Sequence, residues 1–205
     1  MTAAMSDLPS AGAWDEPSQG PRDVPPAGGW TVDHLDALPD DGVRRELLDG
    51  VLVVSPTPTD IHQIIAMRLG VALEDSCPPH YQVTLGVAVR FDRRNNLIPD
   101  VLVATDEAAQ RGSHYYAPRE VVLAVEIVSP SSKKMDRILK PTAFAAARVP
   151  HYWRIETEGG LEVHSYKIDP EGKVYRLVES FRDDIDLAEP WPIKIPIARI
   201  TPRYL

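Results

Sequence analysis

The sequence of 205 residues has a single cysteine, Cys77, and no long apolar run. One cysteine excludes an internal disulfide and a cysteine-rich zinc site, and it is typical of a reducing compartment. No segment approaches the roughly 20 consecutive apolar residues of a membrane-spanning helix. The N-terminus has neither a basic start nor an apolar stretch, so it does not resemble a secretory signal. These absences predict a cytoplasmic protein without a membrane partner.

Hydrophobic residues make up 43% of the chain and charged residues 25%, which is typical of a soluble globular protein with one core. Acidic residues exceed basic ones by 30 to 22, a net charge of −8. Residues 1–40 contribute −6 of this, with seven acidic residues against Arg22 alone, and the other 165 residues contribute −2. The charge of the folded part therefore neither favours nor excludes a nucleic-acid ligand.

Residues 1–29 are rich in Pro, Gly, Ala and Ser and have no apolar periodicity, which predicts a disordered acidic leader. Residues 30–205 are expected to form one domain. A short helix is predicted over residues 31–38, capped by Thr31. A second helix is predicted to begin with Thr57 as N-cap and Pro58 in the first turn, and to end before Pro78.

Strand patterns account for much of the remaining sequence. An Asp-Gly turn separates two short strands within residues 45–55. Apolar and other residues alternate over residues 83–91, which predicts one half-buried strand. The further expected elements are a strand at 97–104, a central strand at 121–128, a helix at 133–148, a strand at 152–156 and a C-terminal hairpin at 161–180. The predicted fold is a mixed α/β sheet flanked by helices, with an additional C-terminal β-hairpin.

Two carboxylates interrupt these apolar strands. Asp100 and Glu126 are each the only charge in a strand that is otherwise predicted to be buried. Burying a carboxylate costs several kcal/mol unless it is paired, protonated or bound to a metal ion. A salt bridge to an arginine or lysine is one explanation. Two acids on successive strands, followed by lysines, favour a functional site in which a divalent cation relieves their repulsion.

Pro99-Asp100 followed by Glu126-Ile127-Val128 resembles the PD-(D/E)xK nuclease superfamily. An ordered set of blocks resembles, more narrowly, the bacterial Uma-type family of restriction-endonuclease-like proteins over residues 30–200. These blocks are residues 45–50 (RELLDG), 55–58 (SPTP) with His62, 98–101 (IPDV), 125–132 (VEIVSPSS), Asp136-Arg137 with Lys140, and 149–153 (VPHYW).

The resemblance implies a restriction-endonuclease-like fold and a Mg²⁺ (or Mn²⁺) site. Asp100 and Glu126 would hold the ion with the backbone carbonyl of Ile127, and Glu46 would add an outer or second-metal ligand. The ion would lower the pKa of a bound water, which would attack the phosphorus of a phosphodiester. From the residues alone, a surface ion pair is the other explanation for Glu46.

The chain departs from the superfamily pattern at Val128, where a lysine is expected. The resemblance implies that Lys140 replaces it, where its ammonium would orient the water and stabilise charge on the phosphate. Pro141 follows directly and disfavours a helical conformation at Lys140, which predicts that the helix breaks or restarts at residues 140–141. The alternative is a solvated lysine.

Several other residues are weaker candidates. His62 lies at the edge of the apolar helix face and is retained as a substrate contact, although a half-buried structural role is favoured. Asp136 is expected to cap the second long helix or to anchor Lys140, with capping as the default. Three clustered arginines are also candidate phosphate contacts, against a default of solvated charges: Arg90, Arg93 and Arg94.

The leading hypothesis is a metal-dependent endonuclease that hydrolyses DNA. The alternatives are a nuclease-fold module that binds nucleic acid or protein without cutting, and a metal-free hydrolase that uses two acids. Cutting a duplex needs two sites, which suits a homodimer. Repulsion between the acids predicts that Mg²⁺ raises the melting temperature and that Asp100→Asn, without metal, melts no lower than the parent.

Overall fold

The computed structural model describes residues 25–130, 132–171 and 173–205. The predicted leader lies outside these residues except for its last five. The helical elements are α1 Val32–Asp36, α2 Asp60–Glu74, α3 Asp106–Ala109, η1 Pro118–Glu120, η2 Met135–Leu139, α4 Lys140–Ala146 and α5 Ile197–Ile200. The strands are β1 Arg45–Leu48, β2 Val51–Val54, β3 Tyr81–Leu85, β4 Ala88–Asp92, β5 Asn95–Leu97, β6 Val101–Thr105, β7 Tyr115–Tyr116, β8 Val121–Ile127, β9 His151–Glu156, β10 Glu162–Ile168, β11 Tyr175–Phe181, β12 Asp184–Leu187 and β13 Ile193–Pro196.

The main sheet has six strands in the order β11-β10-β9-β8-β6-β3, and a five-stranded sheet has the order β2-β1-β5-β4-β7. Only β8 and β9 run parallel in the main sheet, whereas its other pairs are antiparallel. All seven residues of β8 are buried, as its continuous apolar run predicts for a central strand. The expected mixed α/β class and the C-terminal hairpin, β10–β11, are therefore confirmed.

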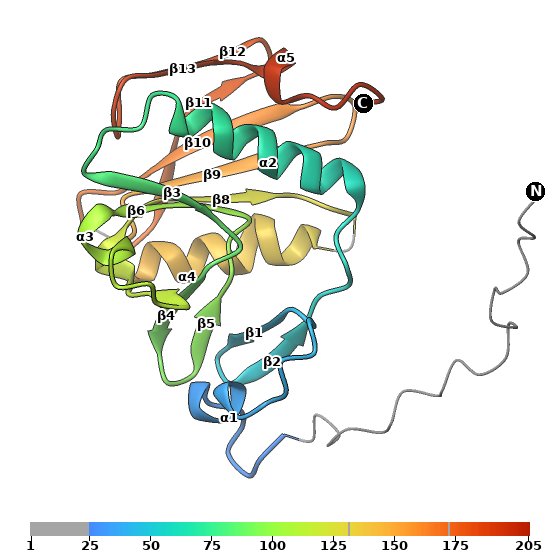
Figure 1. Cartoon of the computed structure of the whole chain (residues 1–205), viewed down its shortest axis with the longest axis vertical. Coiled ribbons are helices and arrows are strands. Elements are labelled where there is room, and N and C mark those ends of the chain that lie inside the picture. Colours follow the sequence, from blue (N-terminus) through green and yellow to red (C-terminus); the bar gives the residue numbers. More distant parts are fainter. Residues whose placement is uncertain (1–24, 131, 172) are drawn as a thin grey trace, which may run out of the picture.

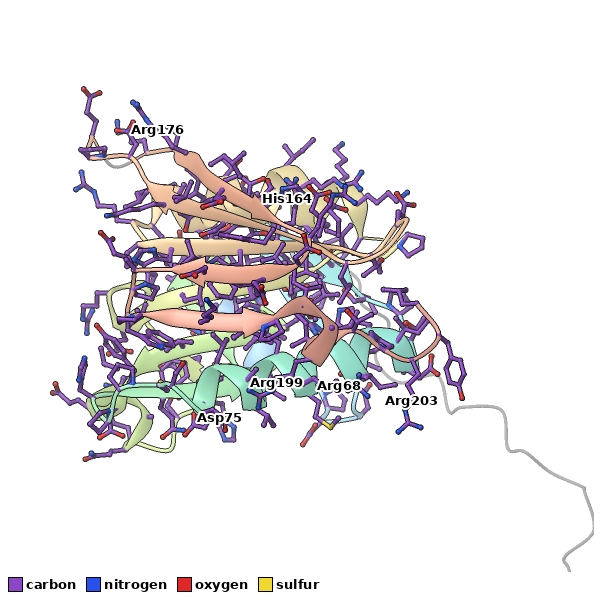
Figure 2. All side chains as sticks on the ribbon, turned by 90° about the horizontal axis from the view of Figure 1, so that it is seen from above. Arg68, Asp75, His164, Arg176, Arg199 and Arg203 are labelled. Carbon is purple, nitrogen blue, oxygen red and sulfur yellow. The ribbon has the colours of Figure 1, made fainter. Side chains whose placement is uncertain are left out.

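Helices cover both faces of the main sheet (Figure 1). On one face, the apolar side of α2 packs with α5 and with the β12–β13 hairpin, which the sequence did not predict. Figure 2 labels Arg199 of α5 and Asp75, next to α2, which form an ion pair where these helices meet. On the other face, Phe144 of α4 packs against Tyr152 of β9. No helix in the described ranges is long and apolar enough to cross a membrane.

The prediction of one strand over residues 83–91 is wrong. The chain bends at Gly86, whose φ is +63°, so that β3 joins the main sheet and β4 joins the five-stranded sheet. The next predicted strand, 97–104, also divides, into β5 and β6. The division lies beside the bend at Gly86, whose N–H donates to the Asp100 carbonyl at 3.3 Å. The alternation of apolar and polar residues does not reveal that the chain passes from one sheet to the other, because both halves keep a period of two.

One expectation about helix ends is wrong, and a second is wrong in part. Helix α2 begins two residues later than predicted, because Thr59 rather than Thr57 is the N-cap and accepts from the His62 N–H at 3.3 Å. Pro141 does not force Lys140 out of the helical conformation, since Lys140 has φ −61° and ψ −51°. The expected restart is present, because the π-helical segment η2 ends at Leu139 and α4 begins at Lys140, which places the proline in the first turn of α4.

Candidate active site

Asp100, directly before β6, and Glu126, within the neighbouring strand β8, line one cavity of about 380 Å³. The Asp100 N–H, just before β6, donates to the carbonyl of Val125 in β8 at 3.0 Å. The two side chains are buried, with exposures of 7% and 1%. The sequence prediction that they come together at one site is therefore consistent with the geometry. The other charged or imidazole side chains that line the cavity are Arg44, Glu46, His62, Asp136 and Lys140.

Three donors hold the carboxylate of Asp100. Arg44 Nη1 donates to Oδ1 at 3.1 Å, the Ile127 N–H donates to Oδ2 at 2.9 Å, and His62 Nε2 lies 3.0 Å from Oδ2. Burial alone would raise the pKa of Asp100. The hydrogen bond and charge of His62, with the charges of Arg44 and Lys140, outweigh burial and lower this pKa to about 2. Asp100 is therefore an ionised, oriented oxygen ligand at neutral pH.

Lys140 projects from the start of α4 into a group of carboxylates. Its Nζ lies 3.1 Å from Glu46 Oε1, 3.0 Å from Glu126 Oε1 and 3.8 Å from Asp136 Oδ1. Lys140 is 3% exposed, and burial opposes its charge. The carboxylates, with that of Glu126 first, more than offset burial and raise its pKa above the ordinary lysine range. The alternative of a solvated lysine is thus wrong, and the ammonium is a fixed charge within the site.

Burial has the largest effect on the pKa values of two acids beside Lys140, Glu126 and Asp136. It raises the pKa of Glu126 well above its usual value, and Lys140 offsets this only in part. It raises the pKa of Asp136 to about 6. Asp136 lies within η2 beside Lys140, so the default expectation that it caps a helix is wrong.

Glu46 belongs to this cluster and is 2% exposed. Its Oε1 accepts from the Ile98 N–H at 2.6 Å, which ties β1 to the segment before Asp100. The neighbouring Arg45 instead pairs with Asp41 at 2.7 Å. A surface ion pair therefore does not explain Glu46, and the first strand contributes a carboxylate to the cavity.

The donor chemistry of this cluster fits a hard divalent cation. Four carboxylates face two permanent cations, Arg44 and Lys140, and the buried Glu126 Oε1 has the ion pair with Lys140 at 3.0 Å but no hydrogen bond of favourable geometry. Across residues 25–130, 132–171 and 173–205, however, no three His, Cys, Asp or Glu side chains are already arranged to hold a metal ion. The ammonium of Lys140, between Glu46 and Glu126, takes the position of a central cation.

Arg44 is the site residue that the sequence analysis missed. It immediately precedes β1 and lies two positions before Glu46, so the period of a strand places both side chains on one face. Burial opposes its charge, but the surrounding carboxylates, first that of Asp100, raise its pKa. The spacing of two positions between Arg44 and Glu46 is the sequence signal that indicates Arg44, once Glu46 is known to be buried.

The three candidate arginines lie elsewhere. Arg90 pairs with Asp36 at 2.7 Å, and Arg93 pairs with Asp33 at 2.6 Å. Arg94 donates to the carbonyls of Gly28 and Asp49. These contacts fasten the segment around α1 to the five-stranded sheet, and none of the three lines the cavity that holds Asp100 and Glu126. Their contact with a phosphate stays a prediction, whereas His62 does line that cavity.

Comparisons with known proteins agree with this fold. A solved structure described as a putative nuclease belonging to DUF820 from Anabaena variabilis matches with a TM-score of 0.65 at 17% sequence identity, covering 83% of this chain and 96% of that one. This likeness establishes a shared fold. A search of curated proteins gives no match. The model of the Uma2 family, described as "Putative restriction endonuclease", matches residues 32–195, so the chain belongs to the Uma2 family of restriction-endonuclease-like proteins.

Proposed function

We propose that the protein is a Mg²⁺-dependent endonuclease that hydrolyses phosphodiester bonds in DNA. The observation that carries the proposal is the pair of buried carboxylates, Asp100 and Glu126, side by side in a cavity with the ammonium of Lys140. Membership of the Uma2 family supports the same reaction class. In this proposal the buried charges serve catalysis rather than stability alone.

Asp100 and Glu126 would hold the ion, with Glu46 and the backbone carbonyl of Ile127 as further oxygen ligands. When bound, Mg²⁺ (or Mn²⁺) supplies Lewis acidity toward the phosphate and a more acidic water. Asp100 is ready for this role because its three donors keep it ionised and fix its orientation.

The cationic side chains have separate tasks. Lys140 keeps its charge in the buried cluster and would stabilise negative charge that develops on the phosphate. Arg44 has a side chain that is 25% exposed at the cavity, so it would attract the phosphate as well as orient Asp100. His62 would orient Asp100 through its Nε2 contact and meet the substrate at the cavity wall.

A second candidate is a module of the same fold that binds nucleic acid or protein without cutting. It is favoured by the place of Lys140, which already compensates Glu46 and Glu126, and by the three donors that occupy Asp100. A protein of this kind would bind its partner equally well with and without a divalent ion.

The decisive experiment is cleavage of supercoiled plasmid and of single-stranded DNA with Mg²⁺ or Mn²⁺. The parent is compared with Glu126→Gln, with a chelator control and with Glu179→Gln, a matched change at an exposed residue of β11. We expect cutting by the parent and Glu179→Gln only. Activity that survives Glu126→Gln refutes the assigned site, and DNA binding without cleavage under all conditions favours the second candidate.

The proposal also includes a homodimer, because cutting both strands at one position needs two active sites. Sedimentation velocity with and without a DNA duplex is the direct measurement. A monomer that nicks only one strand would remove the dimer while leaving the chemistry in place.

A further inference from the structure

A second cavity, of about 300 Å³, lies between η2–α4 and the strands β9, β10 and β11. We refer to it as the tyrosine cavity. It adjoins the first cavity, for which catalysis is proposed and which we call the catalytic cavity, across one helical segment. Asp136 and Lys140 line the catalytic cavity, while Arg137 and Pro141 line the tyrosine cavity. Nothing in the catalytic proposal uses the tyrosine cavity.

Three aromatic rings form its sheet side. The rings of Tyr152 and Tyr175 are stacked, with centroids 5.4 Å apart and planes 22° apart, and Tyr166 lies 6.2 Å from Tyr152. The hydroxyls of Tyr152 and Tyr175 donate to the carbonyls of Asp136 and Val149, both at 2.9 Å. Those hydrogen bonds fix the rings, so the cavity offers a preformed aromatic wall.

The cations of the tyrosine cavity exceed its carboxylates. The guanidinium of Arg154 lies 5.5 Å from the Tyr166 ring centroid. Arg137 and Arg154 share the carboxylate of Glu156, with Nε–Oε1 distances of 2.9 Å each, and Arg137 Nη2 also lies 3.8 Å from Glu158. Lys173 adds a third cation, and no Asp or Glu is among the described residues that line the cavity. Three cations line the cavity and the two adjacent carboxylates offset only part of their charge, which favours an anionic ligand.

Apolar side chains around the opening remain exposed. Ile138 of η2 is 57% exposed and Val174 is 58% exposed. Leu177 of β11 is 54% exposed and lies opposite Tyr166 in the strand register, on the same face of the sheet. Large exposed apolar groups beside an aromatic and cationic cavity indicate a ligand with a flat apolar part.

We propose that the tyrosine cavity binds a nucleotide, with the base against Tyr166 and Tyr175 and the phosphate toward Arg154 and Lys173. A bare phosphate would leave the aromatic wall unused, and an apolar peptide would bury cations without partners. Arg154 pairs in register with Glu126 on the adjacent strand, so the nucleotide lies one strand from the catalytic carboxylate. The ligand is either a free mononucleotide or one nucleotide of a single strand, and the inference stands whether or not the chain cuts DNA.

Calorimetric titration with deoxyadenosine monophosphate tests the proposal. It is run in a chelator, so that catalysis does not enter, beside adenosine and ribose 5-phosphate. We expect one saturable site for the nucleotide, and binding weakened about fivefold or more when either the base or the phosphate is absent. No saturable binding, or equal binding of ribose 5-phosphate, overturns the proposal.

The variants locate the site. Tyr166→Leu and Arg154→Gln should each weaken nucleotide binding about fivefold or more, and Lys173→Gln, at an exposed position, tests the phosphate end without threatening the fold. Lys194→Gln is the matched control, because that lysine is 73% exposed on β13, which packs with α2 on the opposite face of the sheet. Unchanged affinity in all three cavity variants refutes the assignment.

A hexadeoxynucleotide distinguishes the two sources of the ligand. If it displaces the mononucleotide and binds more tightly, the cavity holds one nucleotide of a strand. If it fails to displace the mononucleotide, the ligand is a free nucleotide. Either result supports a nucleotide site, and a missing cleavage activity affects neither measurement.

Discussion

Replacing Lys140 with methionine should destabilise the metal-free protein strongly. Methionine keeps much of the length and apolar volume of the side chain, but removes the ammonium that lies 3.1 Å from Glu46 and 3.0 Å from Glu126. The buried carboxylates then lose their nearest cation. Breaking a buried ion pair by removing one partner costs about 3–5 kcal/mol of unfolding free energy.

For a domain of this size, that cost corresponds to a melting temperature lower by roughly 6–20 °C. Urea unfolding at pH 7.5 and pH 5.5, in a chelator, measures the free energy directly. Folding raises the pKa of Glu126, and that of Asp136 to about 6, so the folded protein binds these protons more tightly than the unfolded chain. The deficit of Lys140→Met should therefore shrink as the pH falls, because the uncompensated carboxyl groups become neutral.

The matched control is Lys134→Met, at an exposed position six residues earlier. It should change the unfolding free energy by less than about 0.5 kcal/mol at both pH values. A loss below about 1 kcal/mol for Lys140→Met, or a loss that is equal at the two pH values, would show that the lysine does not compensate buried carboxylates.

Three further predictions concern stability. Asp100→Asn should lower the unfolding free energy by about 1.5–3 kcal/mol, since the buried carboxylate accepts charged and backbone hydrogen bonds. Urea unfolding in a chelator measures this loss, and parent-like stability would instead support the repulsion expected from the sequence. Mg²⁺ should raise the melting temperature of the parent, by binding the native state, but not that of Glu126→Gln, and an equal rise in both would place the ion elsewhere. Thr59→Ala should cost about 1 kcal/mol and Thr57→Ala under about 0.5 kcal/mol, so equal losses in thermal melts would contradict the observed start of α2.

The sequence and the structure predict opposite effects of Asp100→Asn on the stability of the metal-free protein. Two acids in apolar strands indicate a site and a repulsion, but Arg44 is 56 residues from Asp100 and His62 is 38 residues away. Nothing local to Asp100 reveals that both converge on its carboxylate. The structure replaces repulsion between two acids with a network of donors, and this reverses the expected effect of the substitution.

Lys140 illustrates a different gap. Its spacing after Glu126 and the family blocks identified it as a candidate, whereas Pro141 suggested a break or restart of the helix with Lys140 outside the helical conformation. The rule against proline acts on a missing hydrogen bond and on crowding within the helix interior. At the junction between η2 and α4, Pro141 occupies the first turn of α4, so Lys140 keeps a helical conformation and points into the site.

The sequence by itself determined the mixed α/β class, the central buried strand and the C-terminal hairpin. It also singled out the pair of acids, Asp100 and Glu126, in the apolar strands. These features are encoded by local periodicity and by the cost of a charge in an apolar strand. Only the tertiary structure decided that residues 83–91 divide between two sheets, that Arg44 and His62 hold Asp100, and that Lys140 lies among carboxylates. Those outcomes depend on pairings between distant segments, which the local pattern of either segment does not specify.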